Sequence, residues 1–288
     1  MSRDTSTSTD TTTAAPRRWF ITGANSGFGA AFTEAVLATG DHVVAAVRRP
    51  ETMDTVTAAH SGQVTVLQLD VRDPEARTRA ITAAGRIDVL VNNAGYGLVG
   101  AVEETTEAET REIMDVMFHA PLELTRLVLP QMRERRNGQI VQVSSMGGLL
   151  AFAGVGAYCA AKGALEQVSE ALAAEVADLG IKVLIVEPGA FRTGFAGPAA
   201  LRMSENRITD YDATAGQTRD GLASNHESQE GDPAKAAAAV LETLNADKPP
   251  LRLALGADSV GAIRAKLASV AGDLESTAYL GLGTAVED

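Results

Sequence analysis

A tyrosine and a lysine four residues apart are the first pair in this sequence whose types and spacing could do acid–base chemistry. Tyr158 and Lys162 lie in an apolar-periodic segment, residues 154–179, that predicts a helix. Residues four apart share one helix face, so the phenol and the ammonium can point into the same space. A phenol with a pKa of about 10 is a poor proton donor or acceptor at neutral pH, and a neighbouring cation lowers that pKa. We therefore expect Lys162 to lower the pKa of Tyr158, although the pair alone is also compatible with an ordinary helix surface.

A glycine-rich loop near the start of the chain could bind a phosphate group. The stretch TGANSGFG, residues 22–29, lies between a predicted strand at 17–22 and a predicted helix at 30–38. Glycines allow a tight turn and a close approach of the backbone to phosphate, and a helix N-terminus attracts an anion through its free N–H groups. Because a second strand follows the helix, the loop predicts a dinucleotide site. The loop residues that we expect at the cofactor are Gly23, Asn25, Ser26, Gly27, Phe28 and Gly29.

The end of the second strand should select the nucleotide. A carboxylate there would bind the ribose 2′-hydroxyl of NAD, whereas an arginine can hold the 2′-phosphate of NADP. The strand ends in Arg48 and Arg49, and no acidic residue follows before Glu51. Guanidinium groups give bidentate, charge-assisted bonds to phosphate, which favours NADP(H). The alternative is that both arginines are solvated side chains at a strand end.

Strands and helices alternate along the chain, which predicts an α/β fold of three layers with a doubly wound, mostly parallel, seven-stranded sheet. The periodic segment at 107–136 predicts a long helix that Pro121 and Pro130 bend or end. The predicted strands are 17–22, 42–47, 64–69, 87–91, 139–143, 181–186 and 251–255.

The domain organisation follows from shifts in composition. The first sixteen residues are rich in Thr and Ser and predict a disordered tail, followed by one domain over 17–275 and a C-terminal tail over 276–288. Helical spacing is present at 258–274, close to the end of that domain. Residues 189–231 lack clear periodicity, and a long irregular stretch in a compact domain indicates a functional loop, here a substrate loop.

Composition narrows the class of protein and of partner. The chain has 288 residues, 45% hydrophobic and 22% charged, which suits one large soluble domain. The formal net charge of −12, without a large Lys/Arg cluster, argues against a nucleic acid as partner. The single cysteine, Cys159, excludes an intramolecular disulfide and fits a reducing, cytoplasmic setting. No apolar run approaches a membrane span, and we expect no metal site.

Six short motifs occur along the chain in a characteristic order. They are TGANSGFG at 22–29, LDV at 69–71, NNAG at 92–95, SSMGG at 144–148, YCAAK at 158–162 and EPGAFRT at 187–193. Together they resemble the short-chain dehydrogenase/reductase superfamily in its single-domain Rossmann form, over about residues 18–274. The 13-residue step from Ser145 to Tyr158 matches that family and selects Ser145 rather than Ser144 as the catalytic serine.

The resemblance implies an NADP(H)-dependent oxidoreductase that transfers a hydride between the nicotinamide and a carbonyl or secondary alcohol. Tyr158 would exchange a proton with the substrate oxygen, Ser145 would hydrogen-bond that oxygen, and Lys162 would bond the nicotinamide ribose. The other cofactor contacts that it implies are Asp70 and Val71 beside the adenine, Asn93, Ala94 and Gly95 at the central part, and Pro188, Gly189 and Thr193 at the nicotinamide.

One position departs from the family pattern. The family places an asparagine, in a pattern such as D-V-N-x-x-G, where this chain has Met117. A thioether cannot hold the water that usually links the lysine to solvent. In one hypothesis another water path or His119 compensates and turnover is only reduced. In the other, the fold performs a non-redox step such as dehydration, cyclisation or epimerisation, or binds NADP(H) without turnover.

The residues expected around the substrate are mostly apolar and follow strand ends, which predicts an uncharged, hydrophobic carbonyl or alcohol as substrate. For each of them ordinary packing is an equal alternative. The expected walls are Tyr96, Met146, Leu149, Phe152, Phe191, Phe195, Leu201 and Met203. The family resemblance also implies a homodimer or homotetramer through the helices at 107–136 and 154–179.

Overall fold

Seven parallel strands form the central sheet of the computed structural model, which describes residues 15–195, 197, 200–224 and 228–286. The strand order is β3-β2-β1-β4-β6-β7-β9, and each neighbouring pair is parallel. This confirms the predicted doubly wound α/β fold. The strands are β1 (Arg18–Thr22), β2 (His42–Val47), β3 (Val64–Gln68), β4 (Val89–Asn92), β6 (Gly138–Val143), β7 (Ile181–Pro188) and β9 (Arg252–Leu255).

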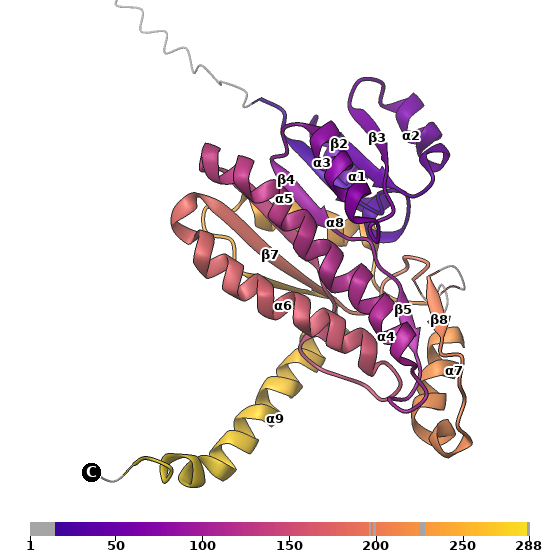
Figure 1. The fold of residues 1–288 in the computed structure, drawn as a ribbon, viewed down its shortest axis with the longest axis vertical. Helices are drawn as coiled ribbons and strands as arrows, with labels where there is room; N and C mark the ends of the chain where they lie inside the picture. Colours follow the sequence, from indigo (N-terminus) through magenta and orange to yellow (C-terminus); the bar gives the residue numbers. More distant parts are fainter. Residues whose placement is uncertain (1–14, 196, 198–199, 225–227, 287–288) are drawn as a thin grey trace, which may run out of the picture.

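Two helical layers cover the two faces of the sheet (Figure 1). On one face lie α1 (Gly27–Ala38) and α8 (Pro233–Asn245), and on the other α3 (Pro74–Ala84), α5 (Ala120–Arg135) and α6 (Gly156–Val176). Successive residues of a strand point to opposite faces, so Trp19 and Ile21 pack into the first layer and Phe20 into the second. The strands are hydrophobic runs because both of their faces are buried.

The remaining elements connect the strands or extend from the sheet. Short helical turns are η1 (Pro50–Met53), η3 (Met146–Gly148), η4 (Ala177–Leu179), η5 (Thr209–Tyr211) and η6 (Asp212–Gly216), and the other helices are α2 (Asp54–Ala59), α4 (Glu107–Met114), α7 (Gln217–Ser224) and α9 (Ala257–Leu282). A second, two-stranded sheet pairs β5 (Gly97–Val99) in parallel with β8 (Leu201–Met203). Of these two strands, β8 lies within the predicted substrate loop.

Helix starts follow local capping chemistry. The Asp73 carboxylate accepts hydrogen bonds from the backbone N–H groups of Glu75 and Ala76 before Pro74 opens α3. Asp232 and Pro233 repeat this arrangement at α8. At α4, Thr106 and Glu109 form a reciprocal capping box, in which each side chain accepts from the backbone N–H of the other residue.

The long helix predicted at 107–136 is interrupted in a different place from the one we expected. A π-helical turn, η2 (Asp115–His119), joins α4 to α5, and the Ala120 N–H reaches back five residues to the Asp115 carbonyl. Pro121 falls in the first turn of α5, where a missing N–H costs no helical hydrogen bond, and α5 continues through Pro130 to Arg135. Of the two effects that we expected from the prolines, bending or ending the helix, the second does not occur.

The two predicted tails meet the structure differently. The N-terminal tail at 1–16 lies almost wholly outside the described residues, of which only 15 and 16 belong to it. At the other end α9 continues to Leu282, past residue 276 where the C-terminal tail was predicted to start. The described part of the chain contains no helix that is long and apolar enough to cross a membrane.

Gly29, in the first turn of α1, packs tightly against the glycine turn that follows β1. A Cβ on Gly29 would lie 2.0 Å from the Gly23 carbonyl oxygen, a backbone atom that cannot move aside without disrupting the turn. We expect Gly29→Ala to lower the melting temperature by roughly 3–10 °C in a thermal unfolding experiment. Gly221→Ala in α7 is the matched control, because its Cβ would meet no atom within 4 Å. Equal melting temperatures for the two variants would contradict this account of the turn.

Candidate active site

The polar motifs converge at the carboxyl edge of the sheet, because parallel strands all end there. Ser145 follows β6, and Tyr158 and Lys162 come from the first two turns of α6, which packs beside β6 and β7. The glycine turn follows β1, and the NNAG motif at 92–95 spans the end of β4. The structure therefore brings together the three residues that the sequence selected as catalytic.

Ser145 and Tyr158 lie side by side, and hydrogen bonding from the Ser145 hydroxyl acts to lower the pKa of the phenol. Gly147 packs against both residues: a Cβ placed there would meet Ser145 Oγ and Tyr158 Cε1 at an ordinary contact distance of 3.4 Å and would crowd Cys159 Sγ at 3.1 Å. The Gly147 N–H donates to Ser145 Oγ over 3.0 Å. This bond holds the serine side chain in place beside the phenol.

The pKa of Tyr158 shifts in the opposite direction from the one that we predicted from the sequence. Burial raises the pKa of Tyr158 to about 12, and the hydrogen bond from Ser145 only partly offsets that rise. The expectation that Lys162 lowers this pKa was wrong for the protein without ligand. Lys162 Nζ lies 5.9 Å from the centre of the phenol ring, over the ring and not at the hydroxyl. The phenol is therefore held fully protonated at neutral pH.

Lys162 is buried and held by the backbone of β6. Its Nζ donates to the Val143 carbonyl oxygen over 2.7 Å, and the residue is 5% exposed. Desolvation lowers the pKa of Lys162 to about 8, although the nearby Glu166 carboxylate favours the charged form. The lysine is thus a cation close to its titration point, fixed between the strand and the face of Tyr158.

Met117 fills the position where the family pattern has asparagine. It is 1% exposed and packs in a cluster of buried apolar side chains with Leu98, Ile113 and Ala161. A Cβ on Gly95 would lie 2.7 Å from Met117 Cε, so the methyl group is pressed against the backbone of the NNAG motif. This packing puts an apolar group between that motif and α6.

The glycine turn has the geometry of a phosphate cradle. Ser26 occupies the N-cap of α1 but its side chain makes no capping hydrogen bond, and the first turn of α1 contains no acidic residue. Thr193 packs closely against this turn, since a Cβ on Gly27 would lie 3.1 Å from the Thr193 carbonyl oxygen. Free N–H groups at a helix N-terminus next to side-chain-free backbone fit a pyrophosphate group. The residues present therefore suit a dinucleotide.

Asn93 connects two of the predicted cofactor segments. Its Nδ2 donates to the Thr22 carbonyl oxygen over 2.8 Å, while the backbone N–H groups of Asn93 and Ala94 both donate to Thr22 Oγ1. The Asn93 side chain is therefore used to tie the end of β4 to the glycine turn. Gly95 is the next residue of this turn, and its backbone packs against the Met117 side chain.

Arg48 and Arg49 are exposed at the end of β2, as the sequence predicted. Neither forms an ion pair with any residue that the structure describes. Asp70 is nearby at the end of β3, and the hydrogen bonds from Arg72, together with the charge of Arg48, lower its pKa. Val71 is partly buried beside it. The two arginines remain available to an anionic ligand at this edge.

Pro188 and Gly189 end β7 against the first turn of α9. A Cβ on Gly189 would lie 2.2 Å from both Asp258 carboxylate oxygens, and the Ala190 N–H donates to Asp258 over 2.7 Å. The segment then runs to Thr193 over the glycine turn. The predicted nicotinamide residues are therefore fixed by α9 on one side and reach the phosphate cradle on the other.

A buried charge cluster that we did not predict from the sequence lies next to the predicted catalytic residues. Arg252 of β9 forms ion pairs with Glu166, Glu170 and Glu187, of which Glu166 is 0% and Glu187 is 2% exposed. Ser144 Oγ donates to Glu166 over 2.5 Å, which connects the cluster to the loop that carries the catalytic serine. Glu166 stands four residues after Lys162 on α6, a spacing that could have suggested it.

Burial and the neighbouring Glu166 carboxylate raise the pKa of Glu187 to about 7, against the opposing effect of Arg252. Two carboxylates that share one guanidinium in a dry site cannot both ionise at low cost. The cluster therefore takes up a proton close to neutral pH.

The residues that we predicted as substrate walls lie in different environments. Phe195 and Leu201 lie against Gly97, and the Phe195 ring meets Tyr158 edge-on at 5.9 Å between ring centres. Phe191 instead packs on Phe28 of α1 in the main core, so it is a core residue and not a pocket wall. The other expected walls range from partly buried to exposed, namely Tyr96, Met146, Leu149, Phe152 and Met203.

Arg202 changes the expected polarity of this wall. Its guanidinium lies 4.3 Å from the centre of the Tyr96 ring and pairs with Glu112 over 2.9 Å. The sequence analysis placed no charged residue here, because β8 and its pairing with β5 could not be seen in the sequence. The apolar wall beside Tyr158 therefore has a charged rim.

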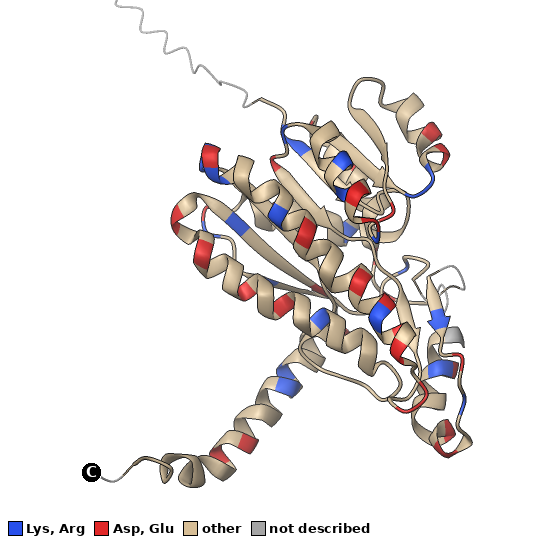
Figure 2. Ribbon diagram, in the orientation of Figure 1, with Lys and Arg blue, Asp and Glu red and all other residues tan. Residues whose placement is uncertain are grey.

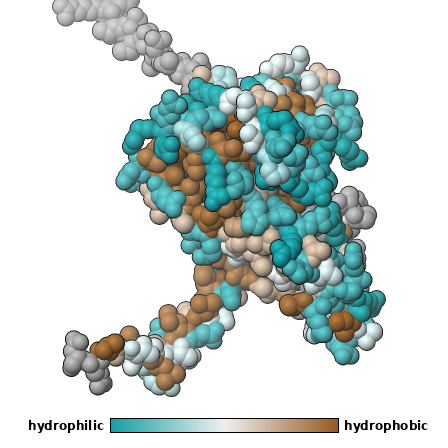
Figure 3. Space-filling view, viewed as in Figure 1, coloured by the Kyte–Doolittle hydropathy of each residue, from teal (hydrophilic) through white to brown (hydrophobic). Residues whose placement is uncertain are grey.

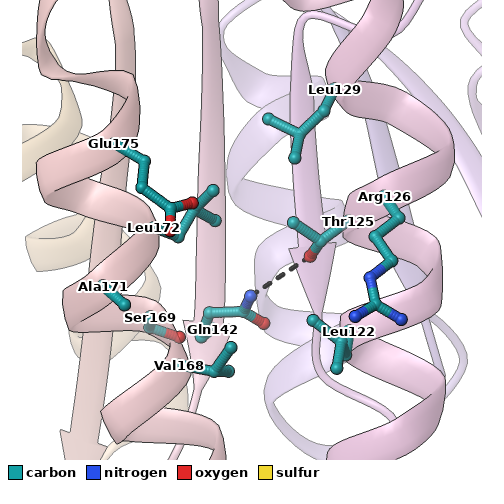
Figure 4. Close-up of a pocket in the computed structure, with 10 residues that line it drawn as sticks. All are labelled: Leu122, Thr125, Arg126, Leu129, Gln142, Val168, Ser169, Ala171, Leu172 and Glu175. Carbon is teal, nitrogen blue, oxygen red and sulfur yellow. Dashed lines mark hydrogen bonds between the residues drawn. The ribbon is translucent and has the colours of Figure 1, made fainter.

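A separate cavity of about 220 Å³ lies between the outer helices, away from the catalytic residues (Figure 4). Side chains of α5 and α6 face each other across it, and Gln142 of β6 at its base donates to Thr125 over 3.3 Å. None of the catalytic side chains lines it. Within the described ranges no group of His, Cys, Asp and Glu is placed to hold a metal ion.

The fold and this constellation define a dinucleotide-binding oxidoreductase of Rossmann type. A family model described as short chain dehydrogenase matches residues 17–203, and the chain belongs to that family. It is 38% identical to "Oxidoreductase BOA17" of Botryotinia fuckeliana, over 84% of this chain and 89% of that protein. It is 35% identical to "3-ketodihydrosphingosine reductase" of Bacteroides thetaiotaomicron, over 84% and 88%.

Among solved structures, a short-chain dehydrogenase from Streptomyces avermitilis is similar to this chain. It is 48% identical, superimposes with a TM-score of 0.89, and covers 94% of this chain and 99% of its own. Members of the family use NAD(P)(H). The resemblance inferred from the motifs is thereby confirmed at the level of family and fold.

The buried cluster makes stability depend on pH. Glu187 has a folded pKa above its unfolded value, so between about pH 4.5 and pH 7 the folded protein binds more protons than the unfolded chain. The contribution of Glu187 to the free energy of unfolding therefore falls as pH rises through this window. We expect Glu187→Gln to melt a few degrees above the parent protein at pH 8, with the difference shrinking toward pH 5. Glu170→Gln, at the exposed partner of the same arginine, should show no such pH trend, and parallel profiles for parent and Glu187→Gln would disprove the assignment.

Proposed function

We propose that the protein is an NADP(H)-dependent reductase or dehydrogenase that acts on a hydrophobic carbonyl or secondary alcohol. The observation that carries the proposal is the contact between Ser145 and Tyr158, next to the buried Lys162. The cofactor, held by the glycine turn at residues 23–29, supplies the hydride.

The chain's own residues then manage the proton and the substrate oxygen. With its pKa raised to about 12, Tyr158 is a proton donor whose proton is present at every physiological pH, which suits the reductive direction. Ser145 can turn its hydroxyl from the phenol to the substrate oxygen and stabilise the negative charge that develops there. A bound ligand that accepts a hydrogen bond from Lys162 in place of the Val143 carbonyl oxygen would bring the ammonium nearer to the phenol. The nearer charge would lower the pKa of Tyr158 and favour transfer of its proton.

We propose that cofactor contacts extend along the carboxyl edge of the sheet. In this proposal Arg48 and Arg49 hold the 2′-phosphate, Asp70 and Val71 flank the adenine, and Pro188, Gly189 and Thr193 border the nicotinamide. The absence of ion pairs at both arginines, within the part of the chain that the structure describes, supports the first assignment. Charge-assisted phosphate binding is a common use of an unpaired arginine pair at such an edge.

The substrate should be largely apolar with an uncharged carbonyl. Phe195 beside Tyr158 and Leu201 beside Gly97 give the wall nearest the phenol no polar group. The name of one relative, "3-ketodihydrosphingosine reductase", is that of a reductase of a keto compound, which agrees with a carbonyl substrate.

A non-redox reaction is the second candidate, and Met117 favours it. The buried thioether against Gly95 supplies no hydrogen bond where the family pattern has an amide. In this alternative Tyr158 and Lys162 drive a dehydration, cyclisation or epimerisation around a bound cofactor. Product formed without net oxidation of NADPH distinguishes it, whereas one NADPH consumed per product formed excludes it.

We also propose that the protein is cytoplasmic and assembles as a homodimer or homotetramer through α5 and α6. The cavity between these helices is lined by Leu122, Leu129 and Leu172, together with Arg126 of α5 on one side and Glu175 of α6 on the other (Figure 4). A second copy could fill this hollow with apolar side chains.

Loss of the phenol hydroxyl tests the acid–base role directly. We expect Tyr158→Phe to lower the rate of NADPH-dependent reduction by about 10²–10⁴-fold, because the aromatic packing on Phe195 remains and only the proton donor is lost. The measurement is the loss of NADPH absorbance with a panel of ketones, aldehydes and quinones, with NADPH binding followed separately by fluorescence. Tyr279→Phe, a 72% exposed tyrosine on α9, is the control. Unchanged turnover in Tyr158→Phe would remove Tyr158 from the mechanism.

The two strand-end arginines test the choice of nucleotide. We expect the double variant Arg48→Ala/Arg49→Ala to raise KM for NADPH by roughly 10- to 100-fold while leaving KM for NADH little changed, since only NADPH carries the 2′-phosphate. Arg111→Ala, at an exposed arginine on α4, should change neither value. An equal effect on the two cofactors would show that the arginines do not read the phosphate.

A further inference from the structure

The last helix, α9, leaves the body of the protein as a free arm (Figure 1). Its first turn is anchored, because Ser259 Oγ donates to the Glu187 carbonyl oxygen over 2.7 Å and Asp258 accepts from the Ala190 N–H. In the second turn Ala262 and Ile263 are still partly buried, and from Arg264 to Leu282 every residue except Ala278 is exposed. At about 1.5 Å per residue the 26-residue helix is about 39 Å long, so most of it stands in solvent.

An arm of this composition should not be stable as a helix by itself. Most helices in proteins are stabilised by packing of an apolar face and not by intrinsic propensity, and Gly261, Gly272 and Gly281 each weaken this helix by about 1 kcal/mol relative to alanine. Its leucine and valine side chains are mostly exposed, with Leu267 at 57%, Val270 at 48% and Leu274 at 64%. A persistent helix with this surface needs a partner that covers it.

Four apolar side chains of the arm follow a heptad pattern, the first of them partly buried and the other three exposed. Ile263, Leu267, Val270 and Leu274 are spaced by four, three and four residues, the a/d repeat of two helices packed along each other. These four side chains form one stripe, while Ala265 and Gly272 lie on the opposite side of the helix. Figure 3 shows apolar surface along this arm. The stripe is therefore built for another helix and not for a flat surface.

The charges on the arm specify what that helix is. Arg264 and Lys266 lie in its first half and Asp273 and Glu275 in its second half, as Figure 2 shows. Beside the stripe, Lys266 and Asp273 flank one edge and Arg264 and Glu275 the other, by their helical spacing. An antiparallel copy of the same helix sets the basic half of each arm against the acidic half of the other. A parallel copy would set like charges together.

The apolar residues fit the same antiparallel arrangement. With the two-fold axis between Ala268 and Ser269, Ile263 of one arm faces Leu274 of the other, and Leu267 faces Val270. Four a/d layers then form without a polar residue in them. In this register Lys266 and Asp273 approach across the edge of the interface twice, once on each side of the axis.

We propose that α9 is a dimerisation arm that pairs antiparallel with α9 of a second copy of this chain, through Ile263, Leu267, Val270 and Leu274. The two bodies then lie at opposite ends of the paired arms, away from each other. Each arm begins at the Glu187 and Ala190 backbone beside the catalytic loop, so pairing also holds that end of the site. This interface is separate from any assembly through α5 and α6.

A lipid surface is the competing partner for an amphipathic helix. Helices that lie on membranes carry a polar face rich in Lys and Arg, whereas this arm has two basic residues balanced by two acidic ones between Ile263 and Leu282. The arrangement of charge in two opposed halves has no use on a membrane. The self-complementary arrangement therefore favours a second copy.

Disulfide trapping tests the register in the full-length protein. We expect a mixture of two single variants, Ile263→Cys and Leu274→Cys, to form a disulfide-linked dimer on mild oxidation, because those positions face each other within about 7 Å. Neither variant alone should cross-link, and the native Cys159 is buried. Cross-linking of Ile263→Cys with itself would show parallel pairing, and the absence of any cross-link would show no pairing at α9; either result overturns the proposal.

Assembly in solution tests the apolar stripe and the charges. We expect Leu267→Glu to reduce the molar mass measured by light scattering on a sizing column, with Ala265→Glu on the opposite side of the helix unchanged. Lys266→Asp should weaken dimerisation by roughly five-fold, and Lys266→Asp/Asp273→Lys should restore it. Equal masses for Leu267→Glu and Ala265→Glu, or a protein that binds vesicles of phosphatidylcholine and phosphatidylserine through α9 as a monomer, would refute the arm as a dimerisation element.

Discussion

The contact between Ser145 and Tyr158 is the interaction on which the rest of the candidate site depends. It forms because the loop after β6 packs against the first turns of α6, with Gly147 at a position where a side chain would crowd Cys159. The parallel sheet brings the ends of β1, β4 and β7 to the same edge, which surrounds this pair with the glycine turn, the NNAG motif and the segment at 187–193. The packing of one loop on one helix thus brings together the residues that we predict to be catalytic.

Burial controls the electrostatics of this site more than pairwise attraction does. Desolvation raises the pKa of Tyr158 and lowers that of Lys162, so each group is pushed toward its neutral form. Below them Glu187 also has a raised pKa, in a cluster organised by Arg252. Ser144 connects this cluster to the catalytic loop. Lys162 and Glu187 are therefore buried with pKa values close to neutral pH. Burying them costs free energy of folding, which the packing of the surrounding core must offset.

Met117 shows how one substitution is accommodated within a family fold. The side chain is packed against Gly95 and within an apolar cluster, and it lies in the π-helical turn that joins α4 to α5. The thioether is flexible enough to fill the space beside that irregular backbone. The position is therefore well packed although it lacks the amide of the family pattern.

The sequence by itself determined the fold and the family, and it supplied the prediction of which residues are catalytic. Alternating strand and helix patterns specify a parallel sheet, and a parallel sheet necessarily places every motif that follows a strand at one edge. The tertiary structure decided what depends on distant residues meeting. Glu166, Glu187 and Arg252 form one cluster only because β7, β9 and α6 are neighbours, and the direction of the Tyr158 pKa shift depends on how deeply the phenol is buried. The pairing of β5 with β8, the core position of Phe191 and the free course of α9 were likewise beyond local patterns, because each is set by contacts, or by their absence, between segments far apart in the chain.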